Sequence, residues 1–222
     1  MPDLRFGCMI LAAWPSSRLG SPKQLLLSGG TPLVANAAEA ALAAGAWPVV
    51  VVLGANADRI RPALARLPVL PVDNPAWTEG MASSIRAGVA ALGQFSQSLE
   101  AALVALADQP AFSAKSIVKL VTAQQATGLG IAAARYEGRL GAPALFLHEH
   151  FAALASVTGE DGARSLLNAD PGRVAAVDLP ELSFDVDTPE DAAKLAKGGP
   201  LTAAWSPRPS STGPHGNRPG PS

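Results

Sequence analysis

The chain has 222 residues, of which 48% are hydrophobic and 16% charged, and its formal net charge is -1. This length suits one domain with a sizeable core, and the near-neutral charge excludes the broad positive field that nonspecific nucleic-acid binding uses. The first apolar stretch ends at Ala13, which is too short for a membrane span and lacks a signal-type basic start. We therefore expect a cytoplasmic protein with neither nucleic acid nor membrane as a partner.

Short aliphatic runs alternate along the chain with longer stretches rich in Ala and Leu. This alternation predicts strands of a buried parallel sheet separated by covering helices. The expected strands are 6–12, 49–53, 69–72, 102–107, 130–134, 143–147 and 174–178, and the expected helices are 32–44, 57–66, 81–92, 114–126, 148–155, 160–168 and 189–196. The predicted fold is a doubly wound, mostly parallel α/β sheet with helices on both faces, whose ligands bind beyond the carboxyl ends of the strands.

The composition changes at the end of the last predicted helix. Residues 197–222 are dominated by Gly, Pro and Ser, and such a segment cannot bury enough apolar area to offset the entropy of ordering it. We therefore predict one domain over residues 1–196 and a disordered tail over residues 197–222.

A polar loop follows the first predicted strand. Trp14 to Gln24 contains small hydroxyl residues, Arg18, Gly20 and Lys23. Backbone N–H groups and two cations in a tight loop suit a triphosphate, although the spacing of a Walker loop is absent. On its own the loop fits an ordinary strand-to-helix turn about as well.

A second polar segment follows the strand at 69–72. Gly80 permits close approach of the backbone to a ligand, and Ser83 and Ser84 offer hydroxyl and amide donors at a helix start. The alternative interpretation is that the two serines only cap the helix and that Trp77 only packs.

Acidic residues follow the apolar strand at 102–107 and precede the last helix. Asp108 stands at a strand's carboxyl end, and alternation in an extended segment would place Asp185 and Asp187 on one face. The single cysteine and three histidines cannot form a thiolate and imidazole zinc site, so a metal would have oxygen ligands, as magnesium does. Asp108 with one of the other two carboxylates could bridge a metal to phosphate oxygens, but Asp187 also directly precedes a helix cap.

Several ordered motifs together resemble those of the molybdenum cofactor cytidylyltransferase family, over roughly residues 6–196. The first three groups are Leu11-Ala12-Ala13 with Ser16, Ser17, Arg18, Gly20, Pro22 and Lys23; Asn74-Pro75, Trp77, Gly80-Met81 and Ser83-Ser84; and Asp108-Gln109-Pro110. The later groups are Gly138, Gly141, Pro143 with Leu145-Phe146; Gly159 with Asp161-Gly162-Ala163-Arg164; and Asp185 with Asp187-Thr188-Pro189-Glu190-Asp191.

The resemblance implies the nucleotide-diphospho-sugar transferase fold and transfer of CMP from CTP to a molybdopterin-type acceptor, with release of pyrophosphate and Mg²⁺ as the cofactor. It also implies a molybdenum hydroxylase or its maturation factor as a candidate partner. The implied catalytic residues are Arg18, Lys23 and Asp108, and the implied metal ligands are Asp108 and Asp187. The implied nucleotide-binding residues are Leu11, Ala12, Ala13, Ser16, Ser17, Arg18, Lys23, Asn74, Gly80, Ser83 and Ser84.

Two positions of the first loop bear on specificity. The guanylyltransferase branch has a second Gly where this chain has Ala13, which favours cytidine. The family has Gly where this chain has Trp14, and a left-handed conformation at Trp14 would cost about 1–2 kcal/mol; Pro15 also removes an N–H donor and favours extended geometry at Trp14. Another NTP or acceptor, or a weakly active or non-catalytic nucleotide-binding protein, therefore stays open.

Overall fold

The computed structural model describes residues 4–16, 19–95, 99–160 and 162–197. Its main sheet has seven strands in the order β5-β4-β1-β6-β8-β7-β9. In chain order these are β1 (Phe6–Ala12), β4 (Val49–Leu53), β5 (Leu70–Asp73), β6 (Ala101–Leu106), β7 (Ile131–Tyr136), β8 (Arg139–Leu147) and β9 (Val174–Asp178). Neighbouring strands are parallel except where β8 pairs with β6 and with β7. The mostly parallel sheet predicted from the sequence is confirmed.

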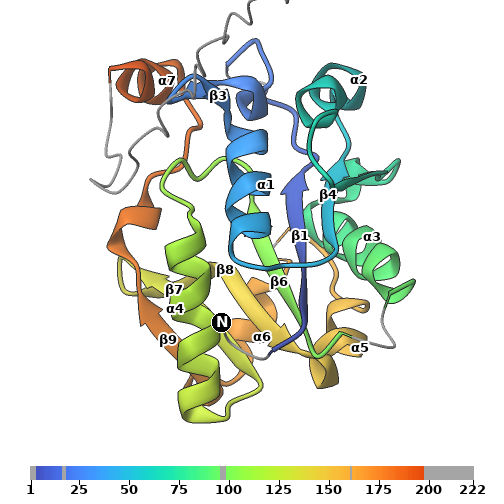
Figure 1. Ribbon diagram of the computed structural model, residues 1–222, viewed down its shortest axis with the longest axis vertical. Helices are drawn as coiled ribbons and strands as arrows, with labels where there is room; N and C mark the ends of the chain where they lie inside the picture. The colour runs from blue at the N-terminus through green and yellow to red at the C-terminus, as the bar shows by residue number, and fades with distance from the viewer. Residues whose placement is uncertain (1–3, 17–18, 96–98, 161, 198–222) are drawn as a thin grey trace, which may run out of the picture.

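Helices cover both faces of this sheet. The α-helices are α1 (Leu33–Ala43), α2 (Ala57–Ile60), α3 (Met81–Gly93), α4 (Ala114–Thr127), α5 (Phe151–Leu154), α6 (Arg164–Ala169) and α7 (Pro189–Ala196). Helices α1 and α4 lie in front of the sheet in Figure 1, and α3, α5 and α6 pack behind it. The predicted doubly wound arrangement in a single domain is confirmed as well. No helix in the described part of the chain is long and apolar enough to cross a membrane.

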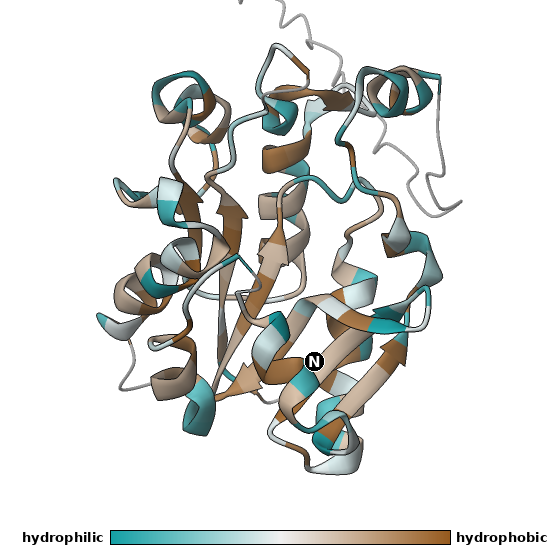
Figure 2. Ribbon diagram, turned by 180° about the vertical axis from the view of Figure 1, so that it is seen from behind, coloured by the Kyte–Doolittle hydropathy of each residue, from teal (hydrophilic) through white to brown (hydrophobic). Residues whose placement is uncertain are grey.

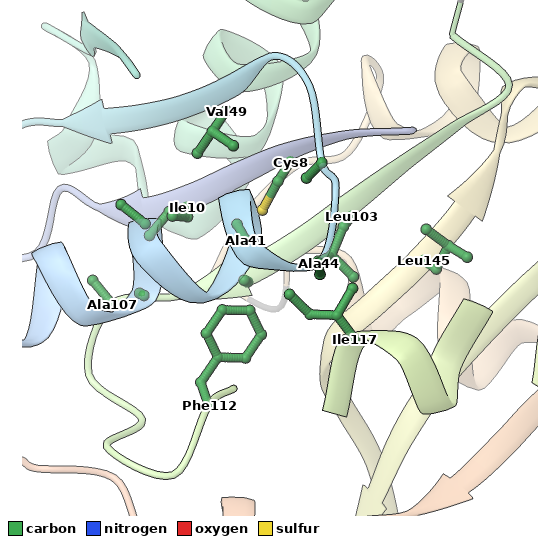
Figure 3. Close-up of a cluster of buried hydrophobic side chains, with 14 of the residues drawn as sticks. Cys8, Ile10, Ala41, Ala44, Val49, Leu103, Ala107, Phe112, Ile117 and Leu145 are labelled. Atoms are coloured by element: carbon green, nitrogen blue, oxygen red, sulfur yellow. The ribbon is translucent and has the colours of Figure 1, made fainter. Parts of the chain in front are cut away.

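The sheet divides the core into two layers because successive side chains of a strand point to opposite faces. Along β1, Cys8 and Ile10 pack on the α1 and α4 side, whereas Met9 and Leu11 pack on the α3 side, and all four are buried. Figure 3 shows the first layer, in which Ala41 of α1 and Ile117 of α4 lie against the sheet. The strands are brown in the hydropathy view of Figure 2, as expected for strands covered on both faces.

Three predicted helices are shorter than expected. The helix at 57–66 becomes α2 followed by a 3-10 turn over Arg61–Leu64, because Pro62 has no N–H to continue the helix. The helix at 148–155 is split into a 3-10 turn over His148–His150 and α5. The helix at 160–168 begins only at Arg164, after Gly159 and Gly162, which both have positive φ.

Two features of the strands were also missed. A small antiparallel ribbon pairs β2 (Leu27–Ser28) with β3 (Thr31–Pro32), and Gly29 and Gly30 form its turn with positive φ. Strand β8 starts at Arg139, four residues before the expected start, and pairs with β7 across a hairpin at Glu137 and Gly138. Apart from Lys197, the predicted tail lies outside the described residues.

The carboxyl ends of β1, β4 and β6 lie at one edge of the sheet, at the top of Figure 1, where α7 also lies. The segment before α7 is fixed there by Val186, which is fully buried against Leu33 and Leu195. The Val186 N–H donates to the carbonyl of Asp108 at 3.2 Å. This packing brings Asp185 and Asp187, which flank Val186, to the end of β6.

The capping box of α7 should matter for stability. The Thr188 hydroxyl accepts from the N–H of Asp191 at 3.2 Å, and the Thr188 N–H donates to the Asp191 carboxylate at 3.1 Å. Replacing Thr188 with Ala should lower the free energy of unfolding by about 1 kcal/mol, measured by urea denaturation. Thr188→Ser keeps the hydroxyl and should stay near the parent; equal losses in both variants would contradict the role assigned to the cap.

Candidate functional site

The loop after β1 is folded back on itself by a buried glutamine. Gln24, which is 1% exposed, donates from Nε2 to the carbonyls of Ala12 at 3.0 Å and Trp14 at 3.1 Å. The Ser16 hydroxyl accepts from the N–H of Lys23 at 2.7 Å. These bonds fix the backbone on both sides of the loop. Lys23 starts a short 3-10 turn over Lys23–Leu25 with its side chain directed toward the end of β6.

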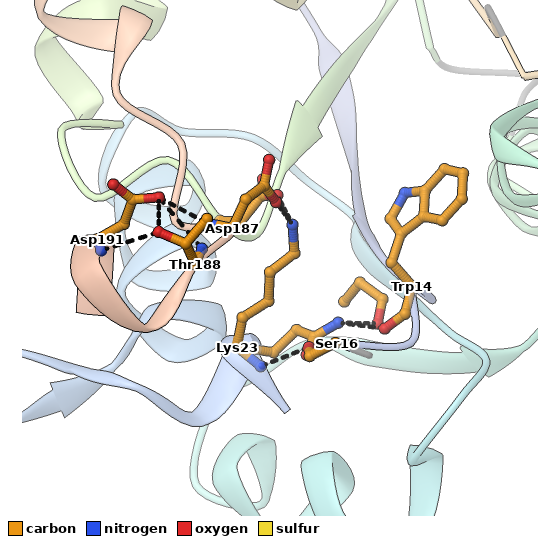
Figure 4. Close-up of polar contacts among 9 residues, drawn as sticks. Trp14, Ser16, Lys23, Asp187, Thr188 and Asp191 are labelled. Carbon is orange, nitrogen blue, oxygen red and sulfur yellow. Dashed lines mark hydrogen bonds and ion pairs between the residues drawn. The ribbon is translucent and has the colours of Figure 1, made fainter. Parts of the chain in front are cut away.

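The Lys23 ammonium lies between two carboxylates. Its Nζ is 2.5 Å from Oδ2 of Asp108 and 2.7 Å from Oδ1 of Asp187. The side chains of Lys23 and Asp108 are 11% and 14% exposed, whereas that of Asp187 is 53% exposed. The two carboxylates outweigh the effect of burial and raise the pKa of Lys23, so the lysine is charged at neutral pH. Figure 4 shows this ion cluster beside the capping box of α7.

A third carboxylate lies behind the ion cluster. Burial, and then the neighbouring charge of Asp108, raise the pKa of Asp185 to about 7. Its Oδ1 atom is buried and has no hydrogen-bond partner, and the same holds for Oε1 of Gln109. The amide of Gln109 is instead directed by a bond from Nε2 to the carbonyl of Leu182 at 3.1 Å. Buried acceptors without donors are rare in folded proteins, and a bound water, an ion or a catalytic role can account for them.

These groups line an open cleft of about 370 Å³ at the carboxyl edge of the sheet. Lys23, Asp108, Asp185 and Asp187 are all part of its wall, so the expected convergence of these carboxylates on one face of the site is observed. The other lining residues are Trp14, Pro15, Ser16, Leu19, Met81, Leu106 and Arg164. The cleft thus holds both charge signs beside apolar surface.

Trp14 is part of the cleft wall. Among the non-glycine residues that the structure describes, Asn56 and Glu137 alone have a positive φ, so the strain expected for a left-handed Trp14 does not arise. In Figure 4 the indole of Trp14 projects from the loop in the same direction as the Lys23 side chain. Trp14, which stands where the family has glycine, therefore places an aromatic ring at the cleft. Its backbone does not adopt the positive φ that glycine favours.

The second motif builds a rigid loop beside the cleft. Asn74 donates from Nδ2 to the hydroxyls of Ser83 at 2.8 Å and Ser84 at 3.1 Å, and all three residues are buried. Gly80 has φ 100°, and a Cβ there would lie 3.0 Å from the carbonyl oxygen of Gly159. Ser83 and Ser84 thus face Asn74 rather than the cleft lining, and Met81 is the residue of this motif that reaches the cleft.

The remaining predicted residues fall into two groups. Leu11, Ala12 and Ala13 are buried at the end of β1, so only their backbone is available to a ligand. Ser17 and Arg18 lie outside the described residues. The role of Gln24 could not be predicted, although it follows Lys23 directly, because only the fold shows that its amide binds the carbonyls at the start of the loop.

The carboxylates of Asp108 and Asp187 fit a divalent cation. Both already hold one positively charged atom, Nζ of Lys23, at 2.5 and 2.7 Å. No group of three or more His, Cys, Asp or Glu side chains in the described residues forms a complete metal site. Magnesium typically takes one or two carboxylates and completes its coordination with substrate phosphates and water. The donor set therefore fits a metal that arrives with a nucleotide.

Comparison with known proteins identifies the family of the chain. Residues 8–182 match the family described as MobA-like NTP transferase domain. The chain is 35% identical over 210 residues to the nicotine blue oxidoreductase of Paenarthrobacter nicotinovorans, covering 88% of this chain and all of that protein.

Two solved structures are similar in fold and sequence. Rv0371c of Mycobacterium tuberculosis H37Rv superposes with a TM-score of 0.73 at 27% identity, covering 88% of this chain and 99% of its own. Its homologue from Mycobacterium sp. strain JC1 has a TM-score of 0.71 at 28% identity, covering 87% and 99%. Because the family's domain is matched over most of the chain, and a relative of similar length is 35% identical, this protein belongs to the MobA-like NTP transferase family and is a nucleotidyltransferase.

Proposed function

We propose that the protein transfers CMP from CTP to the phosphate of a molybdopterin-type acceptor. The observation that carries the proposal is the cluster of Lys23, Asp108 and Asp187 in a cleft large enough for a nucleotide. An oxygen of the acceptor phosphate attacks the α-phosphorus of CTP, the bond from that phosphorus to the bridging oxygen breaks, and pyrophosphate leaves. Ala13, where the guanylyltransferase branch has Gly, supports cytidine as the base.

The proposed roles of the residues follow from their charge. The ammonium of Lys23 holds the triphosphate and stabilises the charge that grows on the leaving pyrophosphate. Asp108 and Asp187 hold Mg²⁺, which when bound offsets the charge on the phosphates. In the structure both carboxylates form ion pairs with Lys23. Binding of CTP with its metal would replace these two ion pairs by contacts of the metal with the carboxylates and of Lys23 with the triphosphate.

A second candidate function comes from the name of the Paenarthrobacter relative, which is an oxidoreductase. The same cleft, with the Trp14 indole in its wall, would then bind a nicotinamide nucleotide rather than transfer a nucleotidyl group. Incubation with each NTP, magnesium and molybdopterin, followed by measurement of pyrophosphate and of the nucleotide product, tests the first function. Oxidation of NADH or NADPH by a quinone-type dye without pyrophosphate release would favour the second.

Loss of the Asp108 carboxylate should abolish most of the transfer. Asp108→Asn keeps the shape of the side chain and removes the charge that holds the metal, so turnover should fall at least about a hundredfold. Circular dichroism should show an intact fold. The matched control is Asp178→Asn. Asp178 lies on β9 and forms an exposed ion pair with Arg135 of β7. If the activity of the Asp108 variant stays within a few-fold of that control, the role of Asp108 as a metal ligand is contradicted.

Replacement of Lys23 should affect metal and nucleotide in opposite directions. Lys23→Met frees two carboxylates from a competing cation, so Mn²⁺ without nucleotide should bind about tenfold more tightly, as followed by electron paramagnetic resonance. CTP affinity should fall about tenfold or more, because a charged hydrogen bond is worth about 1.5–3 kcal/mol. Lys119→Met, on the exposed face of α4, should change neither affinity. A parallel loss of both affinities in Lys23→Met would instead indicate a collapsed site.

Trp14 should contribute to nucleotide affinity as a stacking surface. Truncation of a stacked aromatic costs about 1–3 kcal/mol, so Trp14→Ala should weaken CTP binding about fivefold to a hundredfold by calorimetry. Trp14→Phe keeps a ring and should lose less. Tighter CTP binding in Trp14→Ala, or in Trp14→Gly combined with Pro15→Arg, would show that the indole obstructs the phosphates.

A further inference from the structure

A narrow slot adjoins the cleft behind Asp185. It has a volume of about 90 Å³, and four residues line both hollows: Met81, Leu106, Arg164 and Asp185. The shared walls make the slot an extension of the cleft toward β7 and β8. Since it has about a quarter of the volume of the cleft, it suits one part of a second ligand rather than another nucleotide.

Arg164 is a charged group of the cleft that no carboxylate neutralises. It is exposed at the start of α6, and within the described residues it has neither an ion-pair partner nor a hydrogen-bond partner. Arg86 is paired with Glu79, and Arg135 with Asp178, whereas the arginines outside the cleft that have no partner among the described residues, such as Arg173, face solvent. The charge of Lys23, in contrast, is shared between two carboxylates. Arg164 therefore offers an unused guanidinium, the group best suited to bind a phosphate with two parallel hydrogen bonds.

The rest of the slot combines apolar walls with acceptors. Ile85 and Val104 are buried on one side, and the carboxylates of Glu160 and Asp185 and the hydroxyl of Tyr136 supply oxygen atoms. The Tyr136 hydroxyl donates to the carbonyl of Ala142 at 3.1 Å and accepts from Nε2 of Gln109 at 3.4 Å, so towards a ligand it can only act as an acceptor, with its second lone pair. Such a lining suits an apolar or aromatic ring whose edge carries N–H donors. A sugar phosphate suits it less, because its hydroxyls can donate to these oxygen atoms but also lie against the apolar side chains of Ile85 and Val104.

We propose that the slot and Arg164 form the acceptor subsite, in which Arg164 binds a phosphate monoester at the junction with the cleft and the slot holds an N–H-bearing heterocycle attached to it. This deepens the proposed function, on which it rests for the identity of the reaction. At the junction the phosphate faces the cleft where CTP would lie. Arg164 would thus set the affinity for the acceptor without contributing to that for CTP.

The test uses fluorescent pterins as probes on the full chain without CTP. One probe is a 6-hydroxymethylpterin phosphate, and its partner is the same pterin without the phosphate. Arg164→Gln should weaken binding of the phosphorylated pterin about tenfold to a hundredfold and leave binding of the unphosphorylated pterin unchanged. Arg164→Lys keeps the charge but lacks the planar guanidinium, so it should lose less affinity for the phosphorylated pterin. Arg173→Gln, an exposed arginine beyond the other end of α6, is the control and should change nothing.

Three results would overturn the proposal. These are an unchanged affinity for the phosphorylated pterin in Arg164→Gln, no binding of either pterin to the parent protein, and equally tight binding of ribose 5-phosphate. The outcome is separable from that of the proposed function. Pterin binding that depends on Arg164, without any transfer of CMP, would support the subsite and refute the reaction, whereas CMP transfer with an acceptor KM unaltered in Arg164→Gln would do the reverse.

Discussion

The site depends on one ion cluster that joins three distant parts of the chain. Lys23 comes from the loop after β1, Asp108 from the end of β6, and Asp187 from the segment before α7, 164 residues beyond Lys23. Two partly buried carboxylates side by side repel one another unless a cation lies between them. Here that cation is the lysine, so the residues proposed to bind the metal and the triphosphate also hold one another in place. Under the proposed function, a nucleotide with its metal would take the place of the lysine without leaving the carboxylates unpaired.

The ion cluster keeps its geometry because its supports are rigid. The backbone before Lys23 is fixed by Gln24 and Ser16, and Asp108 follows a strand that is buried on both faces. Asp187 has the weakest support, since it is half exposed and relies on Val186 and on the capping box of α7. Movement of Asp187 would therefore require the least rearrangement of the three residues.

The sequence revealed the parts of this arrangement that depend on local pattern. Continuous apolar runs such as Val49 to Leu53 identify buried parallel strands, and the edge rule then places Asp108 at the ligand crevice. The pairing of Lys23 with Asp108 and Asp187 could not be derived in this way, because it depends on how Val186 packs between Leu33 and Leu195. The short α2 and the late start of α6 were missed since Pro62, Gly159 and Gly162 outweigh a helical apolar pattern. Arg164 was visible within a motif, but only the fold shows that it has no ion-pair partner among the described residues.

The distribution of positive charge gives the cleft a direction. Lys23 lies at the end nearer the β1 loop, where a triphosphate would meet backbone N–H groups, while Arg164 lies where the cleft meets the slot. The carboxylates of Asp108, Asp185 and Asp187 lie in the same wall as both cations. Two anionic substrates repel one another and the carboxylates. They can therefore approach only if each is bound by its own cation and a metal ion offsets the negative charge between them. Among the described residues Arg164 has no carboxylate partner, and a second cation at that junction fits the proposed reaction between two phosphates better than a reaction in which one nucleotide is the only anion.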